Sequence, residues 1–354
     1  MNTSSKFLTA LAVSVLLTAC PGSGGDSSST TTTSTNIFGL AYDTTNSKLY
    51  IANAGRSTIQ SLDPSSLTNT PVTLAGGDNV TGTTNGDGTA ARFYGPFGLV
   101  VSDTIVLVAD TFNNTIRKVS ALTGTKTVTS YATAGGFNQP TALAASLTDI
   151  YVADSNNHAI KKISLTDESV LTWAGLPGTP DSTTDVSRLI ARFNLPMGIA
   201  IDAAVPPNIY VSDSANHTIR KIDSTGNVTT IAGTGVAGYK NSATGSTAQF
   251  NLPTTMVLSG NSLYVTDTNN HAIRIINVTT KAVDTFAGFG AGVLDSTLTA
   301  TPGSTNGIGA AARFTYPRGI AIDNALNLYV GDQTQTKLRK VTVGADVTTF
   351  TTTF

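Results

Sequence analysis

The 354-residue sequence predicts an all-β fold, a six-bladed β-propeller with four antiparallel strands in each blade. Three observations predict this class. One sequence unit recurs six times, each copy holds four short runs with the alternation of half-buried strands, and the chain prefers Thr, Val, Ile, Gly and Asn to the residues that favour helices. A parallel β-helix would need a much shorter period, and a β-sandwich would not repeat so regularly.

The first residues of the chain predict export. Lys6 precedes an apolar stretch at 7–19, which is too short to span a bilayer. The stretch ends in Leu-Thr-Ala-Cys at 17–20, which resembles the lipobox of bacterial lipoproteins, where the cysteine is lipidated and becomes the new N-terminus. The resemblance implies a signal peptide at 1–19, a lipid anchor on Cys20 and delivery to the outer membrane, because proline rather than aspartate follows the cysteine. An ordinary signal peptide with a coincidental cysteine is the alternative.

The lipidated cysteine and a tether rich in Gly, Ser and Thr occupy residues 20–36. Such a segment has nothing to bury, so we expect it to stay flexible and to hold a folded domain off the membrane. The propeller then occupies residues 37–354. This organisation predicts a lipid-anchored protein of the bacterial cell envelope, facing the periplasm or the cell surface.

The repeated unit has an opening, a strand and a turn. Five copies open with Phe-x-x-Pro and continue to an apolar strand that ends in Asp, and a degenerate earlier copy ends at Asn53. The openings are Phe93/Pro96, Phe137/Pro140, Phe193/Pro196, Phe250/Pro253 and Phe314/Pro317, and the strands end at Asp110, Asp154, Asp213, Asp267 and Asp332. The fourth copy shows the four expected strands at 198–202, 208–212, 218–222 and 228–232.

This unit is similar to the NHL repeat of six-bladed propellers. The resemblance rests on the F-x-x-P-x-G-I-A opening, the L-Y-V-A-D strand and the D-x-x-N-H-x-I turn, in register over about residues 37–354. The family often places Arg directly after the Asn-His pair, whereas Ala159, Thr218 and Ala272 stand there in this chain. The first and last copies each hold four strands, and the sequence shows no obvious strand exchanged between the chain ends, so the way in which the ring closes stays open at this point.

A pair of side chains recurs at a fixed spacing. Seven residues after each strand-end Asp the chain has Arg or Lys, whereas the first copy has Asn53 and Gln60. Both positions flank the turn between the second and third strands, so we predict an ion pair that fixes each hairpin. The alternative is that the Asp accepts backbone N–H groups of its own turn. The predicted pairs are Asp110–Arg117, Asp154–Lys161, Asp213–Arg220, Asp267–Arg274 and Asp332–Arg339.

Long connectors are expected to gather on one face of the ring, together with the turns between second and third strands. The blade-to-blade segments at about 76–95, 175–195, 233–252 and 288–316 are long, whereas turns on the opposite face are short. Insertions on one face of a repeat protein mark its binding face, although tolerated surface drift gives the same pattern. The candidate binding residues are Asp87, Arg92, His158, Asp181, Arg192, His217, Tyr239, Lys240, His271 and Arg313.

The chain's three histidines, His158, His217 and His271, occupy one register of consecutive copies. Three imidazoles can bind zinc and leave a place for water, and some propellers of this broad superfamily are metal-dependent lyases or lactonases. A structural role is favoured, because equivalent turns of adjacent blades lie well beyond the roughly 4 Å between ligands of one zinc ion. A calcium loop at 82–88 lacks the terminal Glu of a twelve-residue calcium loop. We therefore predict no metal, no cofactor and no catalytic residue.

Composition and charge restrict the partner. Only 12% of the residues are charged, the net charge is −1, and no basic run is present, which argues against a nucleic-acid-binding surface. A single cysteine forms no internal disulfide, and the chain has no G-x-S-x-G nucleophile motif. We expect a non-enzymatic module that binds an envelope protein or glycan. The alternatives are a metal-dependent lyase or lactonase with its site at the central channel, and a structural subunit of an envelope assembly.

Overall fold

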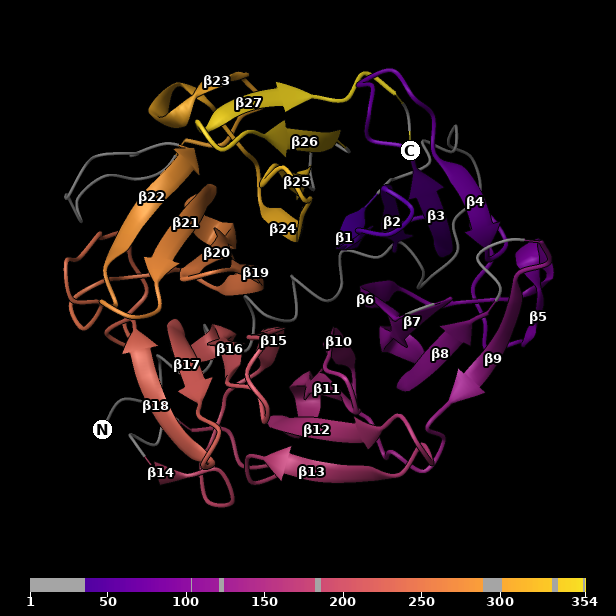
Figure 1. Ribbon diagram of the computed structural model, residues 1–354, viewed down its shortest axis with the longest axis horizontal. Coiled ribbons are helices and arrows are strands. Elements are labelled where there is room, and N and C mark those ends of the chain that lie inside the picture. The colour runs from indigo at the N-terminus through magenta and orange to yellow at the C-terminus, as the bar shows by residue number, and fades with distance from the viewer. Residues whose placement is uncertain are drawn as a thin grey trace, which may run out of the picture.

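The computed structural model describes residues 36–102, 104–120, 124–181, 186–288, 301–332, 337–352 and 354. These residues form six antiparallel sheets arranged as blades around one axis, so the predicted six-bladed β-propeller is confirmed (Figure 1). The predicted signal peptide, the lipid anchor at Cys20 and nearly all of the tether lie outside the described residues. Within the described residues, no helix is long and apolar enough to cross a membrane.

Each blade is a run of strands that follow one another along the chain. Blade 1 holds β1 (Ile37–Asp43), β2 (Lys48–Asn53), β3 (Thr58–Leu62) and β4 (Val72–Ala75). Blade 2 holds β6 (Pro96–Ser102), β7 (Ile105–Asp110), β8 (Thr115–Val119) and β9 (Thr127–Tyr131). Blade 3 holds β10 (Pro140–Ala145), β11 (Asp149–Asp154), β12 (Ala159–Ser164) and β13 (Val170–Ala174).

The second half of the ring repeats this order. Blade 4 holds β15 (Pro196–Ile201), β16 (Ile209–Asp213), β17 (Thr218–Ile222) and β18 (Asn227–Ala232). Blade 5 holds β19 (Pro253–Ser259), β20 (Ser262–Asp267), β21 (Ala272–Asn277) and β22 (Val283–Gly288). Blade 6 holds β24 (Pro317–Ile322), β25 (Leu328–Asp332), β26 (Lys337–Val341) and β27 (Asp346–Thr349). The first strand of each blade is the one nearest the axis (Figure 1).

Three blades carry a fifth strand that the four-strand prediction lacked. The two-residue strands β5 (Gly86–Asp87), β14 (Val186–Ser187) and β23 (Gly307–Ile308) come from the connector before the blade and pair with its outermost strand, β9, β18 or β27. A pairing between segments about forty residues apart leaves no local alternation in the sequence. The long connectors are thereby partly built into the sheets rather than left as free loops.

The core lies between successive blades. The phenylalanine of the repeat opening is fully buried in four blades, at Phe93, Phe193, Phe250 and Phe314. Phe193, for example, packs in one apolar cluster with Ile160 of β12 and Val211 of β16. Each opening thus fills the space between one blade and the next, and this burial is the main apolar contribution that holds neighbouring sheets together.

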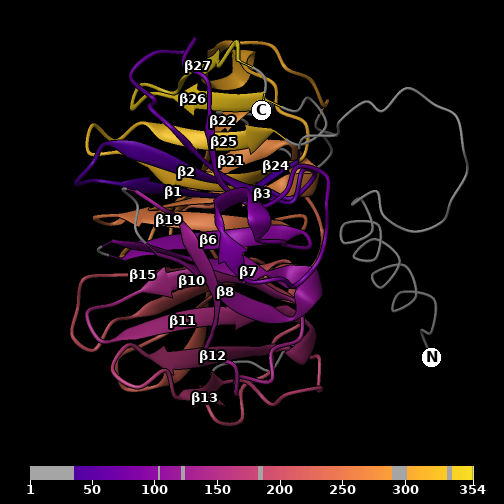
Figure 2. The same ribbon diagram turned by 90° about the vertical axis from the view of Figure 1, so that its right-hand side faces the viewer.

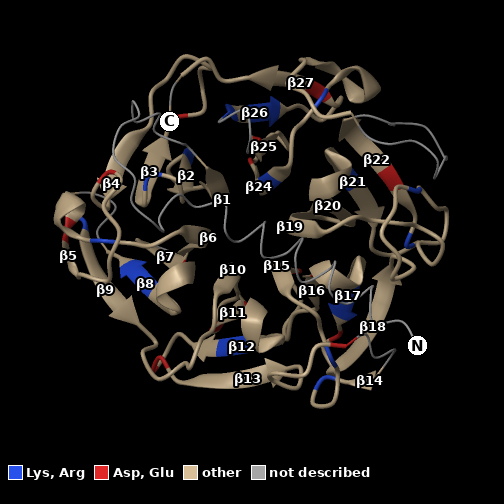
Figure 3. Cartoon of the chain, turned by 180° about the vertical axis from the view of Figure 1, so that it is seen from behind, with Lys and Arg blue, Asp and Glu red and all other residues tan. Residues whose placement is uncertain are grey.

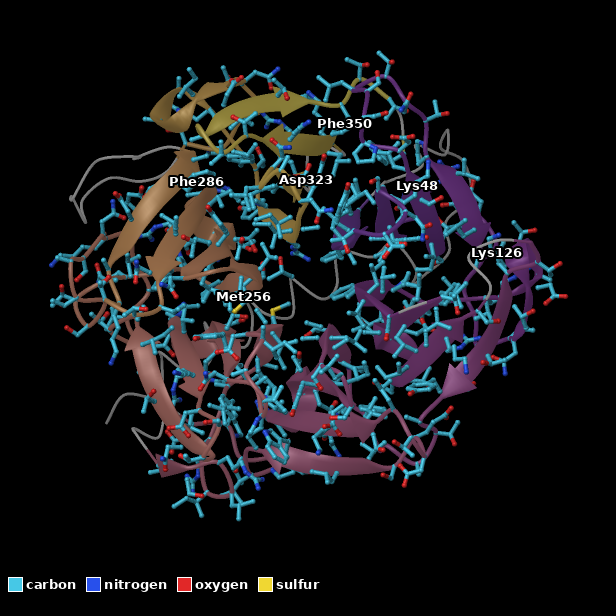
Figure 4. The ribbon with its side chains drawn as sticks, viewed as in Figure 1. Lys48, Lys126, Met256, Phe286, Asp323 and Phe350 are labelled. Carbon is cyan, nitrogen blue, oxygen red and sulfur yellow. The ribbon has the colours of Figure 1, made fainter. Side chains whose placement is uncertain are left out.

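Among the described residues, the ring closes by packing, without a strand exchanged between its ends. Phe350 and Phe354 near the C-terminus are buried in a cluster that joins Leu338 of β26 to Ile37 and Leu49 of blade 1. Phe350 lies at this junction in Figure 4, and Figure 2 shows the ring edge-on. The backbone N–H of Thr351 also donates to the carbonyl oxygen of Leu67 at 3.0 Å.

Candidate functional site

Four blades contain a buried ion pair between the aspartate that ends the second strand and the arginine seven residues later. Nη1 of Arg117 lies 3.0 Å from Oδ2 of Asp110, and both side chains are fully buried. The other three pairs are Arg220–Asp213 at 3.2 Å, Arg274–Asp267 at 2.8 Å and Arg339–Asp332 at 3.0 Å. The basic residues recur on the third strands, such as β8, β17 and β26, which are blue in Figure 3.

All four aspartates also accept a backbone N–H from the connector, and Asp110, Asp213 and Asp267 accept a side-chain amide of their own turn as well. Oδ1 of Asp110 accepts the backbone N–H of Tyr94 at 2.7 Å, and Oδ2 accepts Nδ2 of Asn113 at 2.8 Å. The backbone donor lies sixteen residues upstream, so the alternative in which the aspartate accepts N–H groups of its own turn does not describe it. Burial raises the pKa of Asp110 to about 6, while the hydrogen bonds from Asn113 and Tyr94 and the charge of Arg117 lower it.

The buried arginines hold the long connectors in place. Nη2 of Arg117 donates to the carbonyl oxygen of Thr84 at 3.1 Å and to Oδ1 of Asn85 at 2.7 Å, and Nη1 donates to the carbonyl oxygen of Arg92 at 2.8 Å. Its guanidinium also lies over the ring of Phe93, 5.2 Å from the centroid. Equivalent bonds join Arg274 to Lys240, Asn241 and Gln249, and Arg339 to Thr305, Asn306 and Arg313.

Blade 3 departs from the predicted pattern. Lys161 donates to the carbonyl oxygen of Gly135 at 3.1 Å and makes no direct ion pair with Asp154. The connector before this blade, at 132–139, is short. It presents no carbonyl oxygens far from Lys161, so the longer reach of a forked guanidinium is not needed here. Asp154 is instead held by the backbone N–H of Asn138 and by Nδ2 of Asn157, both at 2.7 Å.

In blades 2 to 5 the turn after the second strand is a single 3-10 turn that ends in a left-handed residue. In η3 (Ser155–Asn157), η4 (Ser214–Asn216) and η5 (Thr268–Asn270) this last residue is a histidine, and in η2 (Thr111–Asn113) it is Asn114. The three histidines have φ of 54°, 55° and 52°. Asn and His visit this region more readily than most residues, which accounts for the histidine of each Asn-His pair, while the Asn before it donates from its side-chain amide to the strand-end Asp.

Each imidazole accepts a hydrogen bond from the following blade. Nδ1 of His158 accepts the backbone N–H of Leu195 at 3.1 Å, and Nδ1 of His271 accepts that of Tyr316 at 3.0 Å. His217 does the same for Leu252 at 3.1 Å. Burial lowers the pKa of all three histidines. Within the described residues, no group of three or more His, Cys, Asp or Glu side chains could hold a metal ion.

The candidate binding residues on the connectors have mixed surroundings. Arg92 and Arg313 are half-buried and donate to carbonyl oxygens of their own connectors, and Arg192 forms an exposed ion pair with Asp181 at 3.0 Å. Lys240 is half-buried. Oδ1 of the exposed Asp87 accepts a hydrogen bond from the hydroxyl group of Thr127, 2.7 Å away.

Two residues proposed for the binding surface are buried. Tyr239 is 3% exposed, because its ring packs against the guanidinium of Arg274 and its hydroxyl bonds to Thr285 in the outer strand β22. His271 is 7% exposed beneath the ring of Tyr316, whose centroid is 4.6 Å away. Neither side chain belongs to the accessible face that the sequence predicted.

The six inner strands enclose a small cavity at the axis of the ring. This cavity of about 50 Å³ is lined by residues from all six inner strands, most of them apolar, among them Met256, which Figure 4 shows near the centre of the ring. At the end of the axis on the side of the long connectors, Phe38 stacks on Phe97 at 4.0 Å and the guanidinium of Arg318 lies 4.3 Å from the Phe38 ring. All three are buried.

The sequence interpretation missed these axial residues, although the sequence contained a signal for them. Phe97 and Arg318 occupy the position after the proline of the opening, and Phe38 follows Ile37 at the start of β1. The position after the proline varies within the chain while its neighbours repeat. That position holds Phe97, Thr141, Met197, Thr254 and Arg318 in blades 2 to 6. The structure of the blade does not determine the residue at a position that varies inside a repeating motif. Such a position can therefore differ from one propeller to another.

Comparison with known proteins identifies the repeats. The family model described as NHL repeat matches residues 137–163 and 250–276, which run from the opening phenylalanine to the third strand of blades 3 and 5. The six blades define the class, a β-propeller built of repeats. The chain contains NHL repeats, as its openings, strands and turns predicted.

Curated relatives match only part of the chain. NHL repeat-containing protein 2 of Bos taurus is 39% identical over 102 residues, which are 28% of this chain and 14% of that protein. Protein SUPPRESSOR OF QUENCHING 1, chloroplastic, of Arabidopsis thaliana is 41% identical over 85 residues, 23% of this chain and 8% of that protein. The chain therefore spans a seventh or less of the length of these relatives.

Solved structures match nearly the whole chain. An auxiliary nutrient binding protein from Bacteroides thetaiotaomicron has a TM-score of 0.62 and 16% identity, over 90% of this chain and 70% of that chain. A streptogramin B lyase has a TM-score of 0.53 and 14% identity, over 91% of this chain and 84% of that chain. At these identities the likeness shows the propeller fold alone.

Proposed function

We propose that this propeller is a binding module whose face of long connectors takes an envelope protein or a glycan. The observation that carries the proposal is the anchoring of those connectors by buried arginines, such as Arg117 on Thr84 and Asn85. A loop that is already ordered loses less conformational entropy when a partner binds, so the same contacts give a tighter complex. Surface loops that only drifted in length would not need a buried guanidinium to hold each one.

The side chains available for catalysis favour binding over an enzyme. The alternative of a metal-dependent lyase or lactonase needs a ligand set and a cavity at the axis. The imidazoles of His158 and His217 each accept a backbone N–H of the next blade, and the axial cavity of about 50 Å³ has mainly apolar walls. Two neighbours in fold are titled a nutrient binding protein and a lyase, so the fold admits both roles. The remaining alternative, a structural subunit of an envelope assembly, predicts a stable partner that co-purifies.

The proposed location is the outer membrane of a bacterium, with the chain anchored through a lipid on Cys20. The leader, the single cysteine at its end and the Gly/Ser/Thr segment after it support this location. Metabolic labelling with a fatty acid tests it: we expect label in the wild type and none in the variant Cys20→Ala. An unlabelled wild-type protein in the soluble periplasmic fraction would contradict the anchor.

Site-specific photo-crosslinking tests the binding face. A benzophenone amino acid at Tyr316, which is 39% exposed at the end of the long connector that leads into β24, should crosslink to a partner in intact cells. The matched control is Leu147, which is 88% exposed on a short turn at the opposite face. Purified envelope glycans serve as a second probe for binding. Equal crosslinking at the two positions, or none at Tyr316 together with no glycan binding, would contradict the proposal.

A further inference from the structure

A two-point contact joins each of four blades to the next. In the first contact, the last residue of the turn after the second strand accepts a hydrogen bond from a backbone N–H of the next blade, that of the residue before the opening proline. In the second contact, the Ser or Thr at the start of the same turn donates to the carbonyl oxygen of that proline. The N–H acceptors are Nδ1 of His158, His217 and His271 and Oδ1 of Asn114. The hydroxyl donors are Thr111, Ser155, Ser214 and Thr268, whose bonds to the proline carbonyls measure 2.7, 2.5, 2.6 and 2.8 Å.

The two contacts differ in their response to acid. Nδ1 of an imidazole accepts a hydrogen bond only while that nitrogen has no proton, and protonation turns it into a donor that faces the N–H of the next blade. A hydroxyl and a side-chain amide do not titrate in this range. Acid therefore removes one of the two contacts at the junctions of blades 3–4, 4–5 and 5–6, and neither contact at the junction of blades 2–3, where Asn114 accepts the N–H of Gln139 at 2.8 Å.

We propose that His158, His217 and His271 are an acid-sensitive clamp, which closes three consecutive blade junctions at neutral pH and opens them on protonation. Three of the four long connectors, at 175–195, 233–252 and 288–316, end on the clamped N–H or next to it. Opening the clamp therefore loosens the connector side of blades 4, 5 and 6 and leaves the junction of blades 2 and 3 unchanged. The clamp is a property of the fold and does not depend on the proposed partner.

The direction of the pH effect follows from burial. Burial lowers the pKa of each imidazole below its ordinary value, so the folded protein binds fewer protons here than the unfolded chain. The stability that these groups contribute is present above about pH 6.5 and is lost as the pH falls below that value towards the folded pKa.

Other charged groups surround the imidazoles. Each imidazole has an aspartate in its own turn and one in the next blade, and each of these carboxylates has a cation of its own blade nearby. The aspartates are Asp154, Asp213, Asp267 and Asp332, the cations are Lys161, Arg220, Arg274 and Arg339, and the connectors add Asp181, Arg192, Lys240 and Arg313. Burial raises the pKa of the aspartates, so their protonation in acid favours the folded state, opposite to the histidines. A test must therefore separate the effect of histidine protonation from the effect of aspartate protonation.

Amide hydrogen exchange of the whole protein, followed by NMR at about pH 7.5 and about pH 5, makes this separation. After correction for intrinsic rates, we expect protection of the Leu195, Leu252 and Tyr316 amides to fall about tenfold in acid, and protection of the Gln139 amide to stay the same. The variant H158N/H217N/H271N keeps the aspartates and places at each junction the acceptor that Asn114 supplies in blade 2. It should keep its protection in acid. Wild-type amides with unchanged protection, or an equal loss in the Asn variant, would overturn the clamp.

Discussion

Asn53 donates a hydrogen bond from its side-chain amide to Oε1 of Gln60, 3.3 Å away, at the positions where four other blades bury an Asp–Arg pair. Both residues are buried. The chain thus replaces both charges together or neither, because a lone buried charge costs more than a buried neutral pair.

Removing one charge of such a pair should cost more than removing both. Arg117→Gln leaves the carboxylate of Asp110 buried without its cation and frees the connector at Thr84 and Asn85, so we expect a loss of about 3–5 kcal/mol in the free energy of unfolding. The double variant D110N/R117Q recreates the neutral pair of blade 1 and should lose at least about 1 kcal/mol less. Urea unfolding of both variants measures this, and losses that simply add would contradict a coupled pair.

Shortening the same cation should loosen the connector while keeping the charge. Arg117→Lys retains a cation beside Asp110, but an ammonium group cannot make the forked contacts to Thr84 and Asn85. We expect a global loss of only about 1–2 kcal/mol and a marked increase in hydrogen exchange across residues 82–92. The control is Lys161→Arg in blade 3, where the short connector should show no matching gain of protection. Unchanged exchange at 82–92 would mean that the connector orders itself without the guanidinium.

The repeats made most of the fold predictable. Openings, strands and turns are short patterns, and six copies in register fix the number of blades. The seven-residue spacing also placed Asp and Arg across one hairpin, because Asp110 pairs with Thr115 and Val108 with Arg117 in the antiparallel register. These are local relationships, which alternation and strand pairing decide.

Contacts between blades, and between a connector and the blade that it enters, were not predictable in the same way. His158 meets the N–H of Leu195, 37 residues later, and Tyr239 is buried against Thr285, 46 residues later. No pattern within one copy encodes such a partner. Tyr239 was therefore predicted to be an accessible loop residue, and the histidines were predicted to lie on the binding face. The two-residue strands such as β5 were not predicted for the same reason, because their partner strands lie in a later part of the chain.

Chelation should leave the protein unchanged. The three imidazoles lie in three different blades and each already accepts an N–H, so removing metal with a chelator should not shift the midpoint of thermal unfolding, and the purified protein should contain less than one zinc per chain. Elemental analysis and a melting curve with and without chelator check this. Stoichiometric zinc that disappears in H158N/H217N/H271N would favour the lyase or lactonase instead.

The inner strands should tolerate no side chain at their closest approach. A Cβ on Gly198 of β15 would lie 2.0 Å from the carbonyl oxygen of Thr254 in the next blade, so Gly198→Ala must push two blades apart. We expect a loss of about 1–3 kcal/mol or more. Gly344→Ala is the control, because the nearest atom to its Cβ would be 3.9 Å away. Equal melting temperatures for the two variants would show that the blades around the axis are looser than this contact requires.

Closure of the ring by packing makes one junction depend on a few aromatic side chains. Phe350 is 2% exposed and packs in the cluster that joins blade 6 to Ile37 and Leu49 of blade 1. No described strand crosses this junction, so Phe350→Ala should cost about 3–5 kcal/mol, as for a large cavity in a core, and should raise hydrogen exchange in β1 and β2 before other strands. Val343→Ala, at a side chain that is 64% exposed on the turn before β27, is the matched control and should change stability by less than about 0.5 kcal/mol. If Phe350→Ala unfolded all six blades in a single step with no early exchange in blade 1, the closure would be no weaker than any other junction of the ring.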